Sequence, residues 1–341
     1  MRQPSVADPD HFGFGRGSRA RRREFESMGF ISELRHPTKL YTKLVIALLT
    51  LAFFILLAMG AISGFLVYRI VLPVRSRSDV DLKNLPGHPL VLTFNVSGEG
   101  QRDGWFFPGL KNAPAIVLCP AYDWSRTELL TLASSLQDQQ YNVMLFDFSG
   151  HGSAAGQSTL GFREVAELRA AMDAVANRGD VDANHFGLWG VDMGAYVALS
   201  EAVGDKRVTA IVAESPYEHP NDMVAVEISR SGLGSLPFIT RLSEVIFQWL
   251  NPPFRNVPPL KARIPKFSGV NQLYLQTPEE PMLATSTSEL FRVSPPPHEL
   301  VTLEHGNYAA MLDDEKRNYE NRIESFFLIN LPLVGPEPGN K

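Results

Sequence analysis

The 341-residue sequence has a single cysteine and no excess of positive charge. Because Cys119 stands alone, no disulfide can form within the chain, and cysteines cannot build a metal site. The formal net charge of −5 at pH 7 gives no basic bias, so we expect no nucleic-acid partner. No motif indicates a cofactor or a metal ion, and we expect neither.

Charge is also missing from the stretch that runs from Leu44 to Tyr68. About 20 apolar residues cross the core of a bilayer, so this stretch predicts one transmembrane anchor at residues 44–72. A buried core helix would show a polar face, and a cleaved signal peptide would have a shorter apolar region. We therefore expect a lipid bilayer as a partner of the chain.

Basic residues lie on both sides of this anchor, and those nearest to it nearly balance. They are Arg21, Arg22, Arg23, Arg35, Lys39 and Lys43 before it, and Arg69, Arg75, Arg77 and Lys83 after it. The arginine triplet favours a cytoplasmic N-terminus, which would leave the large domain on the extracytoplasmic side. Residues 1–43 are predicted to be a disordered basic leader, residues 73–85 a linker and residues 334–341 a tail.

Residues 86–333 alternate between strand-like and helix-like segments. Strands are expected at 90–96, 104–108, 115–119, 141–148, 186–191, 208–213, 272–276 and 300–303, with helices at 127–137, 164–176 and 315–327. This alternation predicts an α/β fold with a mainly parallel sheet and helices on both faces. The alternation stops at residues 218–267, which we interpret as a short cap insertion over the site.

A serine is missing from the turn where the sequence most suggests one. Residues 186–196 predict a buried strand, a sharp turn at Asp192 and the start of a helix. Gly190 and Gly194 flank Asp192 at the spacing small-x-nucleophile-x-small, and only small residues allow so tight a turn. An aspartate at this position indicates either different chemistry or none.

Four stretches in this order resemble the α/β-hydrolase superfamily, in particular its bacterial serine-esterase and acyl-peptidase branch. They are residues 146–152 (FDFSGHG), the turn around Asp192, residues 213–217 (AESPY) and residues 303–308 (LEHGNY). The resemblance covers residues 86–333 and implies an α/β-hydrolase fold. With the anchor, it implies a single-pass protein of a bacterial inner membrane.

The resemblance also implies site residues. His305 follows the last strand, where this family carries its catalytic base, and Glu280 falls at the position of the acid, with Glu279 as its rival. Asp192 takes the position of the nucleophile. The backbone N–H of Met193, with that of Ala121 or Tyr122, would donate to a developing oxyanion.

The family's His-Gly at the start of this oxyanion loop is replaced by Cys119-Pro120. His151 and Asp147 belong to a loop that is structural in this family. We therefore leave both residues out of the predicted site.

A carboxylate can attack an sp³ carbon and form an alkyl ester, as in the superfamily's haloalkane dehalogenases and epoxide hydrolases. Their helper groups are missing here, because Met193 replaces the tryptophan of the former and residues 218–270 lack the tyrosines of the latter.

Three hypotheses follow. The first is a hydrolase that uses Asp192, His305 and Glu280 on an unknown small-molecule or acyl substrate. The second is a catalytically inactive protein of this fold that has lost the nucleophilic serine and binds a lipid, a peptide or a partner protein. The third is a domain that recognises a cationic group through Asp192.

Overall fold

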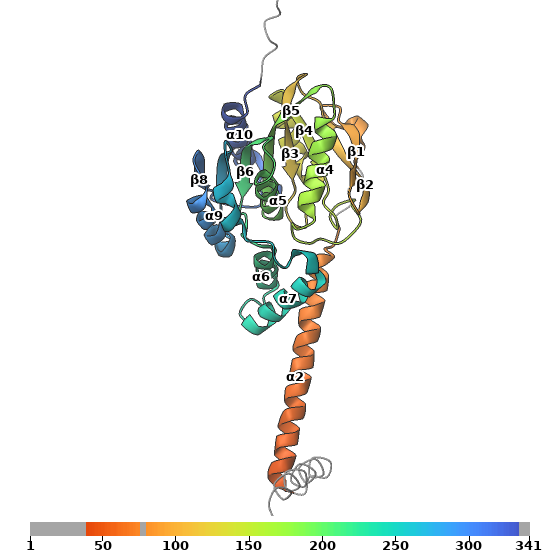
Figure 1. Cartoon of the computed structure of the whole chain (residues 1–341), viewed down its shortest axis with the longest axis vertical. Coiled ribbons are helices and arrows are strands. Elements are labelled where there is room, and N and C mark those ends of the chain that lie inside the picture. The colour runs from red at the N-terminus through yellow and green to blue at the C-terminus, as the bar shows by residue number, and fades with distance from the viewer. Residues whose placement is uncertain (1–38, 76–79, 334–341) are drawn as a thin grey trace, which may run out of the picture. The chain divides into compact units, whose positions relative to one another are not determined.

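The computed structural model describes residues 39–75 and 80–333. The predicted tail and all but the last few residues of the predicted leader lie outside this range, as do residues 76–79 of the predicted linker. The chain divides into two units, Met1–Ala61 and Ile62–Lys341. The second unit contains the sheet, the candidate site and the C-terminal end of the first described helix (Figure 1).

The helix α2 (Leu40–Val71) covers residues 44–71 of the predicted anchor, beginning four residues before it and ending one residue short of its predicted end. Its length and apolar composition are sufficient to cross a membrane. The helix ends just before Pro73, because proline disfavours the helical conformation of the preceding residue and lacks an N–H to donate. In the second unit, Val67, Ile70 and Val71 are buried, so the last turns of α2 pack as part of that unit.

The described residues form one eight-stranded sheet in the order β1-β2-β4-β3-β5-β6-β7-β8. The strands are β1 (Leu90–Val96), β2 (Gly100–Phe107), β3 (Ala113–Cys119), β4 (Asn142–Phe146), β5 (Val181–Val191), β6 (Val208–Glu214), β7 (Asn271–Gln276) and β8 (His298–Thr302). The pairs β1–β2 and β2–β4 are antiparallel, and the other five are parallel. The mainly parallel sheet is confirmed.

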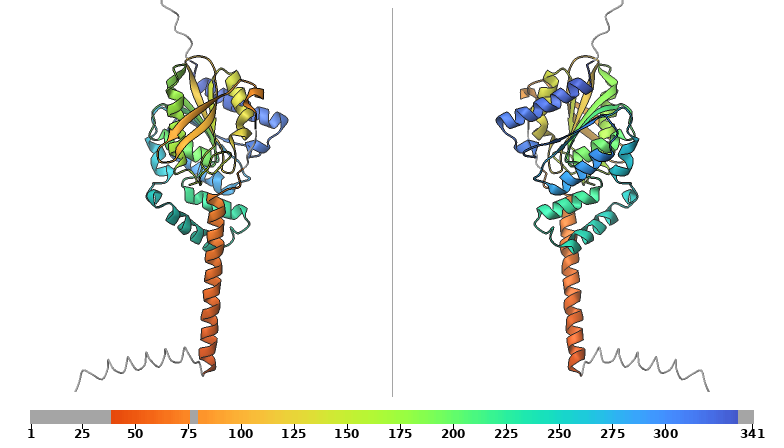
Figure 2. Two further views of the ribbon diagram at one scale, coloured as in Figure 1. Left: turned by 90° about the vertical axis from the view of Figure 1, so that its right-hand side faces the viewer. Right: turned by 90° about the vertical axis from the view of Figure 1, so that its left-hand side faces the viewer.

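Helices cover both faces of this sheet (Figure 2). The helices after α2 are α3 (Leu130–Asp138), α4 (Glu164–Ala176), α5 (Met193–Ala202), α6 (Pro220–Arg230), α7 (Pro237–Leu250), α8 (Leu260–Arg263), α9 (Pro281–Val293) and α10 (Asp313–Asn330). The helices α3 and α10 pack together on one face, whereas α4, α5, α8 and α9 form a contact series on the other. Strands β3 and β4 are buried along their whole length because both faces are covered.

The segment between β6 and β7 contains α6, α7 and α8 and two 3₁₀ turns, Pro252–Phe254 and Ile264–Lys266. The sequence predicts a cap insertion at residues 218–267, and helices without strands occupy this stretch. His219 begins α6 with a capping box, in which its ring accepts from Asn221 N–H and Asp222 accepts from His219 N–H. The helix α6 carries Glu227 and Arg230 to the candidate site.

Candidate functional site

A cavity of about 470 Å³ lies at the carboxyl ends of the parallel strands. Its walls come from the loops after β3, β5, β6, β7 and β8 and from α6. The lining residues are Ala121, Tyr122, Asp123, Trp124, Val191, Asp192, Glu214, Ser215, Glu227, Arg230, Thr277, Glu279, Glu280, Leu283, Gly306 and Asn307. We call it the Asp192 cavity.

The strand–turn–helix arrangement predicted around Asp192 is present. Asp192 lies between β5 and α5 with φ 38° and ψ −100°, a conformation that side-chain-bearing residues rarely adopt. The flanking glycines permit it, since a Cβ added at Gly194 would lie 2.1 Å from the carbonyl oxygen of Cys119. A Cβ at Gly190 would in turn meet the Gly194 backbone at 2.4 Å.

The Asp192 carboxylate occupies the two N–H groups that the sequence assigns to an oxyanion. Oδ1 accepts a hydrogen bond from Tyr122 N–H at 2.8 Å and another from Met193 N–H. Of the two residues left open for the first donor, it is Tyr122 that donates, whereas Ala121 lines the wall. Within the described chain, Oδ2 of Asp192 has no hydrogen-bond partner.

Burial raises the pKa of Asp192 to about 7, although the Arg230 charge and the two N–H donors lower it. Glu214, at the end of the neighbouring strand, also lines the cavity. Burial raises its pKa to about 7, opposed by the Tyr319 hydroxyl, which donates to Oε2 at 2.5 Å. Two carboxyl groups in one cavity therefore change protonation near neutral pH.

The structure does not bring His305 to this cavity. The imidazole side chain is 62% exposed, and its Nδ1 lies 3.1 Å from Oε1 of Glu315 at the start of α10. The loop is turned by Gly306, whose N–H donates to Glu279, and by Asn307, which adopts a left-handed conformation. Gly306 and Asn307 thus face the cavity, whereas His305 lines a separate surface crevice beside α10.

The expected contact of Asp192, His305 and Glu280 is therefore not formed. Glu280 lines the Asp192 cavity, but its Oε1 accepts from Arg230 Nε at 2.9 Å. Glu279 is the acid that touches the loop of His305, through Oε2 and the Gly306 N–H at 2.9 Å. Both acids lie at the cavity, and neither contacts the imidazole.

Arg230 and Ser215 are two lining residues that sequence reasoning missed. The Arg230 guanidinium bridges Glu280 and Glu227, and its Nη1 lies 2.7 Å from Glu227 Oε1. Ser215 is only 4% exposed, and its hydroxyl has no partner among the described residues. A buried hydroxyl without a partner is costly, so Ser215 places an unsatisfied polar atom in the wall of the cavity.

The lining holds six carboxyl groups and, among the described residues, one cationic side chain, Arg230. The carboxyl groups are those of Asp123, Asp192, Glu214, Glu227, Glu279 and Glu280. Within the described ranges, no three histidine, cysteine or acidic side chains converge in a way that could hold a metal ion. The cavity is therefore acidic without metal-ligand geometry.

Tyr122 joins this cavity to the end of α2. Its hydroxyl donates to the carbonyl oxygen of Ile70 at 2.9 Å, while its N–H donates to Asp192. A second crevice of about 430 Å³ lies beside the same helix end and shares four lining residues with the Asp192 cavity. The shared residues are Tyr122, Asp123, Glu227 and Arg230.

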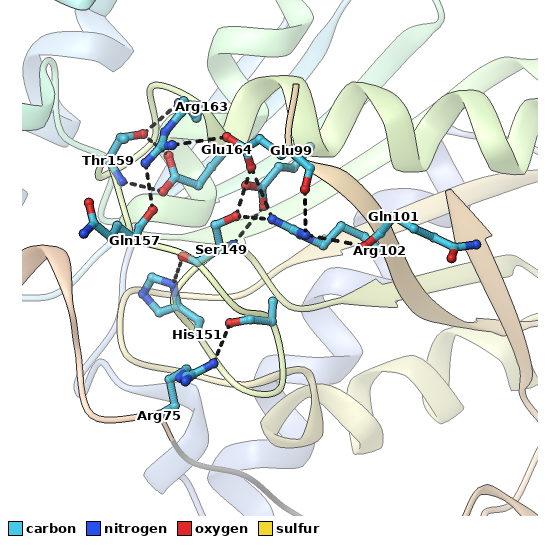
Figure 3. Close-up of polar contacts among 12 residues, drawn as sticks. Arg75, Glu99, Gln101, Arg102, Ser149, His151, Gln157, Thr159, Arg163 and Glu164 are labelled. Atoms are coloured by element: carbon cyan, nitrogen blue, oxygen red, sulfur yellow. Dashed lines mark hydrogen bonds and ion pairs between the residues drawn. The ribbon is translucent and has the colours of Figure 1, made fainter. Parts of the chain in front are cut away.

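A network of buried polar groups supports the loop behind the turn at Asp192 (Figure 3). Glu164 accepts from Ser158 and from the N–H and hydroxyl of Thr159, and Ser158 also donates to Met193 Sδ. In the same loop, His151 is buried, and its Nδ1 lies 3.0 Å from the carbonyl oxygen of Ser149.

Asp147, at the start of this loop, is a second carboxylate that accepts several hydrogen bonds. Its carboxylate accepts from the N–H of Arg126 and from the N–H and hydroxyl of Ser153. Neither His151 nor Asp147 lines the Asp192 cavity.

Known proteins share this fold. A solved esterase of Pyrococcus furiosus, Pf2001, superposes with a TM-score of 0.60 at 18% identity, over 77% of this chain and 98% of the esterase. The uncharacterized protein Rv2307c of Mycobacterium tuberculosis is 31% identical over 156 residues, which are 43% of this chain and 54% of that protein. The polyketide transferase grgF of a Penicillium species is 30% identical over 144 residues, 41% of this chain and 45% of the transferase.

The chain spans about half the length of these two relatives. Residues 116–319, more than half of the chain, match the family described as "Alpha/beta hydrolase family". This match includes the turn at Asp192, the two predicted acids Glu279 and Glu280, and the loop of His305. By the arrangement of its sheet and by this match, the chain belongs to the alpha/beta hydrolase family.

Proposed function

We propose that this chain is a membrane-tethered binding protein of the α/β-hydrolase fold, which holds a small ligand with a cationic amine in the Asp192 cavity. The position of the Asp192 carboxylate carries the proposal. Its Oδ1 already takes the N–H donors of Tyr122 and Met193, which in ester hydrolysis must be free for the oxyanion. Ester hydrolysis also needs a base at the nucleophile, and His305 contacts Glu315 instead.

The charge of the cavity supports an amine as the recognised group. Six carboxyl groups face one guanidinium, and two of those carboxyl groups, Glu227 and Glu280, are already paired with Arg230. A ligand ammonium would meet Oδ2 of Asp192, which has no partner within the described residues. Hydrogen bonds to charged groups contribute roughly 1.5–3 kcal/mol each.

An isosteric ligand series tests this proposal. Saturation-transfer NMR on the full chain in nanodiscs would compare 3-aminopropan-1-ol, 1,3-propanediol and 3-hydroxypropanoate. We expect the amine to bind at least tenfold more tightly than the diol, and Asp192→Asn to remove that advantage. Because the pKa of Asp192 is about 7, its charge forms as the pH rises, so amine affinity should increase from pH 6 to pH 8.

Asp138→Asn is the matched control, since Asp138 is an exposed acid outside the cavity. This variant should bind the amine as the wild type does. Preference for 3-hydroxypropanoate would show that Arg230 dominates the site and would contradict the proposal.

A second candidate is the predicted hydrolase with Asp192 as nucleophile. One observation favours it: Oδ1 is held by two N–H donors while Oδ2 has no partner in the described chain, so Oδ2 is available to attack an sp³ carbon. His305 would then have to leave Glu315 to activate water. Single turnover of a haloalkane or epoxide mixture in ¹⁸O-water would leave label in Asp192, detected by peptide mass. An unlabelled Asp192 after confirmed turnover would exclude this candidate.

The tether rests on α2, whose long apolar stretch can cross a membrane. The arginine triplet at residues 21–23 favours a cytoplasmic N-terminus, so the proposal places the hydrolase-fold unit outside the cytoplasm, at a bacterial inner membrane. Adding a protease to intact spheroplasts tests this orientation, since an extracytoplasmic domain is cleaved without lysis. Protection of the domain in intact spheroplasts would place it on the cytoplasmic side and contradict the proposed orientation.

A further inference from the structure

The helix α7 exposes an apolar stripe. Phe238, Val245 and Trp249 are spaced seven and four residues apart, which places them on one side of a helix, and each is about half exposed or more. The opposite side of α7 is buried through Ile239 and Phe247. An amphipathic helix normally turns its apolar residues inward, so an apolar stripe on the outer side needs a partner.

The helix α7 lies beside the end of α2. Ser63 is fully buried, and its hydroxyl donates to the carbonyl oxygen of Ile239 at 3.4 Å. Ser63 is six residues before Arg69, the charge that ends the apolar stretch, which corresponds to about 9 Å along the helix. The start of α7 therefore lies beside Ser63, within the charge-free residues 62–68 that precede Arg69 in the same unit. Figure 1 shows α7 next to this end of α2.

The residues around the stripe suit a membrane interface. Trp249 is the most exposed residue of the stripe, and the Arg255 guanidinium lies 4.9 Å from its ring centroid. Tryptophan and arginine collect at the level of lipid headgroups, where an apolar body and a polar end are both accommodated. Arg241, beside the stripe, is 82% exposed and would reach the headgroups from the same helix.

We propose that the exposed stripe of α7 lies in the interface of the lipid bilayer that α2 spans. The inference rests on the proposed tether and is independent of the ligand of the Asp192 cavity. The bilayer is the occupant because the Ser63–Ile239 contact fixes α7 at the depth of the apolar stretch of α2. Since α6 and α7 pack together, α7 would hold the lining residues Glu227 and Arg230 next to the membrane surface.

Spin labels at single cysteines test the inference in the full chain. Cys119 is fully buried, and Cys119→Ala provides a cysteine-free background. Val245→Cys reports the stripe, Leu51→Cys reports the apolar stretch of α2, and Asp138→Cys is an exposed control on α3. Each labelled protein is reconstituted into phosphatidylcholine–phosphatidylglycerol vesicles, and collisions with oxygen and with the nickel complex NiEDDA are measured by power saturation.

We expect oxygen collisions to exceed nickel collisions several-fold at positions 51 and 245, with the ratio reversed at position 138. Oxygen access at 51 with nickel access at 245 would overturn the assignment of α7 and leave the tether standing. Nickel access at both would overturn the tether and the inference with it. Spin–spin broadening at 245 in place of oxygen access would show a second copy on the stripe and would also overturn the bilayer assignment.

Discussion

Replacing Glu164 by glutamine should lower the free energy of unfolding by about 3 kcal/mol. The buried carboxylate accepts four hydrogen bonds, from the hydroxyls of Ser158 and Thr159 and from the backbone N–H groups of Thr159 and Gly161. A glutamine has one acceptor oxygen, so in either orientation its NH₂ faces one of those N–H donors. For a domain of this size the melting temperature should fall by roughly 6–12 °C.

Glu167→Gln is the matched control, one helical turn further along α4. Glu167 is equally buried, but it accepts one hydrogen bond, from Ser149 N–H, and its Oε1 has no partner among the described residues. Burial, followed by the charge of Glu164, raises its pKa to about 8, so the amide removes a group that is costly to ionise. Thermal melts in detergent should show no loss for this variant at pH 8, and equal losses for both variants would contradict the network.

Replacing Asp192 by asparagine should make the protein more stable at pH 8 and leave it nearly unchanged at pH 4. The pKa of Asp192 rises from 3.8 to about 7 on folding, so the folded protein binds this proton more tightly than the unfolded chain does. Its contribution to stability therefore falls as the pH rises from about 4 to about 7. A shift of about three units corresponds to roughly 4 kcal/mol, or roughly 8–16 °C in melting temperature.

The asparagine keeps an oxygen for the N–H groups of Tyr122 and Met193, so the turn itself should persist. Glu214 has a raised pKa of the same sign, and some pH dependence should remain in the variant. Melting curves from pH 4 to pH 8 on wild type, Asp192→Asn and the exposed control Asp138→Asn measure the difference. Parallel curves for wild type and Asp192→Asn would show that Asp192 is not the group responsible.

The sheet could be predicted from the sequence because its strands are short apolar runs between turns. Strands such as β3 and β6 are buried along nearly all of their length, so a continuous apolar run in the sequence marks each of them. The start of β5 was placed five residues too late, since Asp182, Asn184 and His185 are polar, and pairing of Val181 with Ala113 extends the strand. The helix α9 was not predicted, and its threonines and serines at residues 285–288 carry weak helical preference.

The site could be predicted where it depends on local geometry. Gly190 and Gly194, each two residues from Asp192, specify the turn. In such a turn the N–H of the next residue, here Met193, lies near the side chain at the turn. The place of His305 depends instead on contacts distant in sequence, between Glu279 and Gly306 and between Glu315 and the imidazole. Arg230 was missed for the same reason, because only the packing of α6 over the strand ends brings it to the cavity.

Tyr122 connects the end of α2 to the Asp192 cavity through two hydrogen bonds. One residue donates through its hydroxyl to Ile70 and through its N–H to Asp192, so the helix and the carboxylate are two ends of one short linkage. A displacement of the helix end that Tyr122 does not follow lengthens one of these two hydrogen bonds. In the proposed membrane-tethered protein, lateral tension or a change in bilayer thickness that pulls on α2 would thus act on the hydrogen bond that orients Asp192.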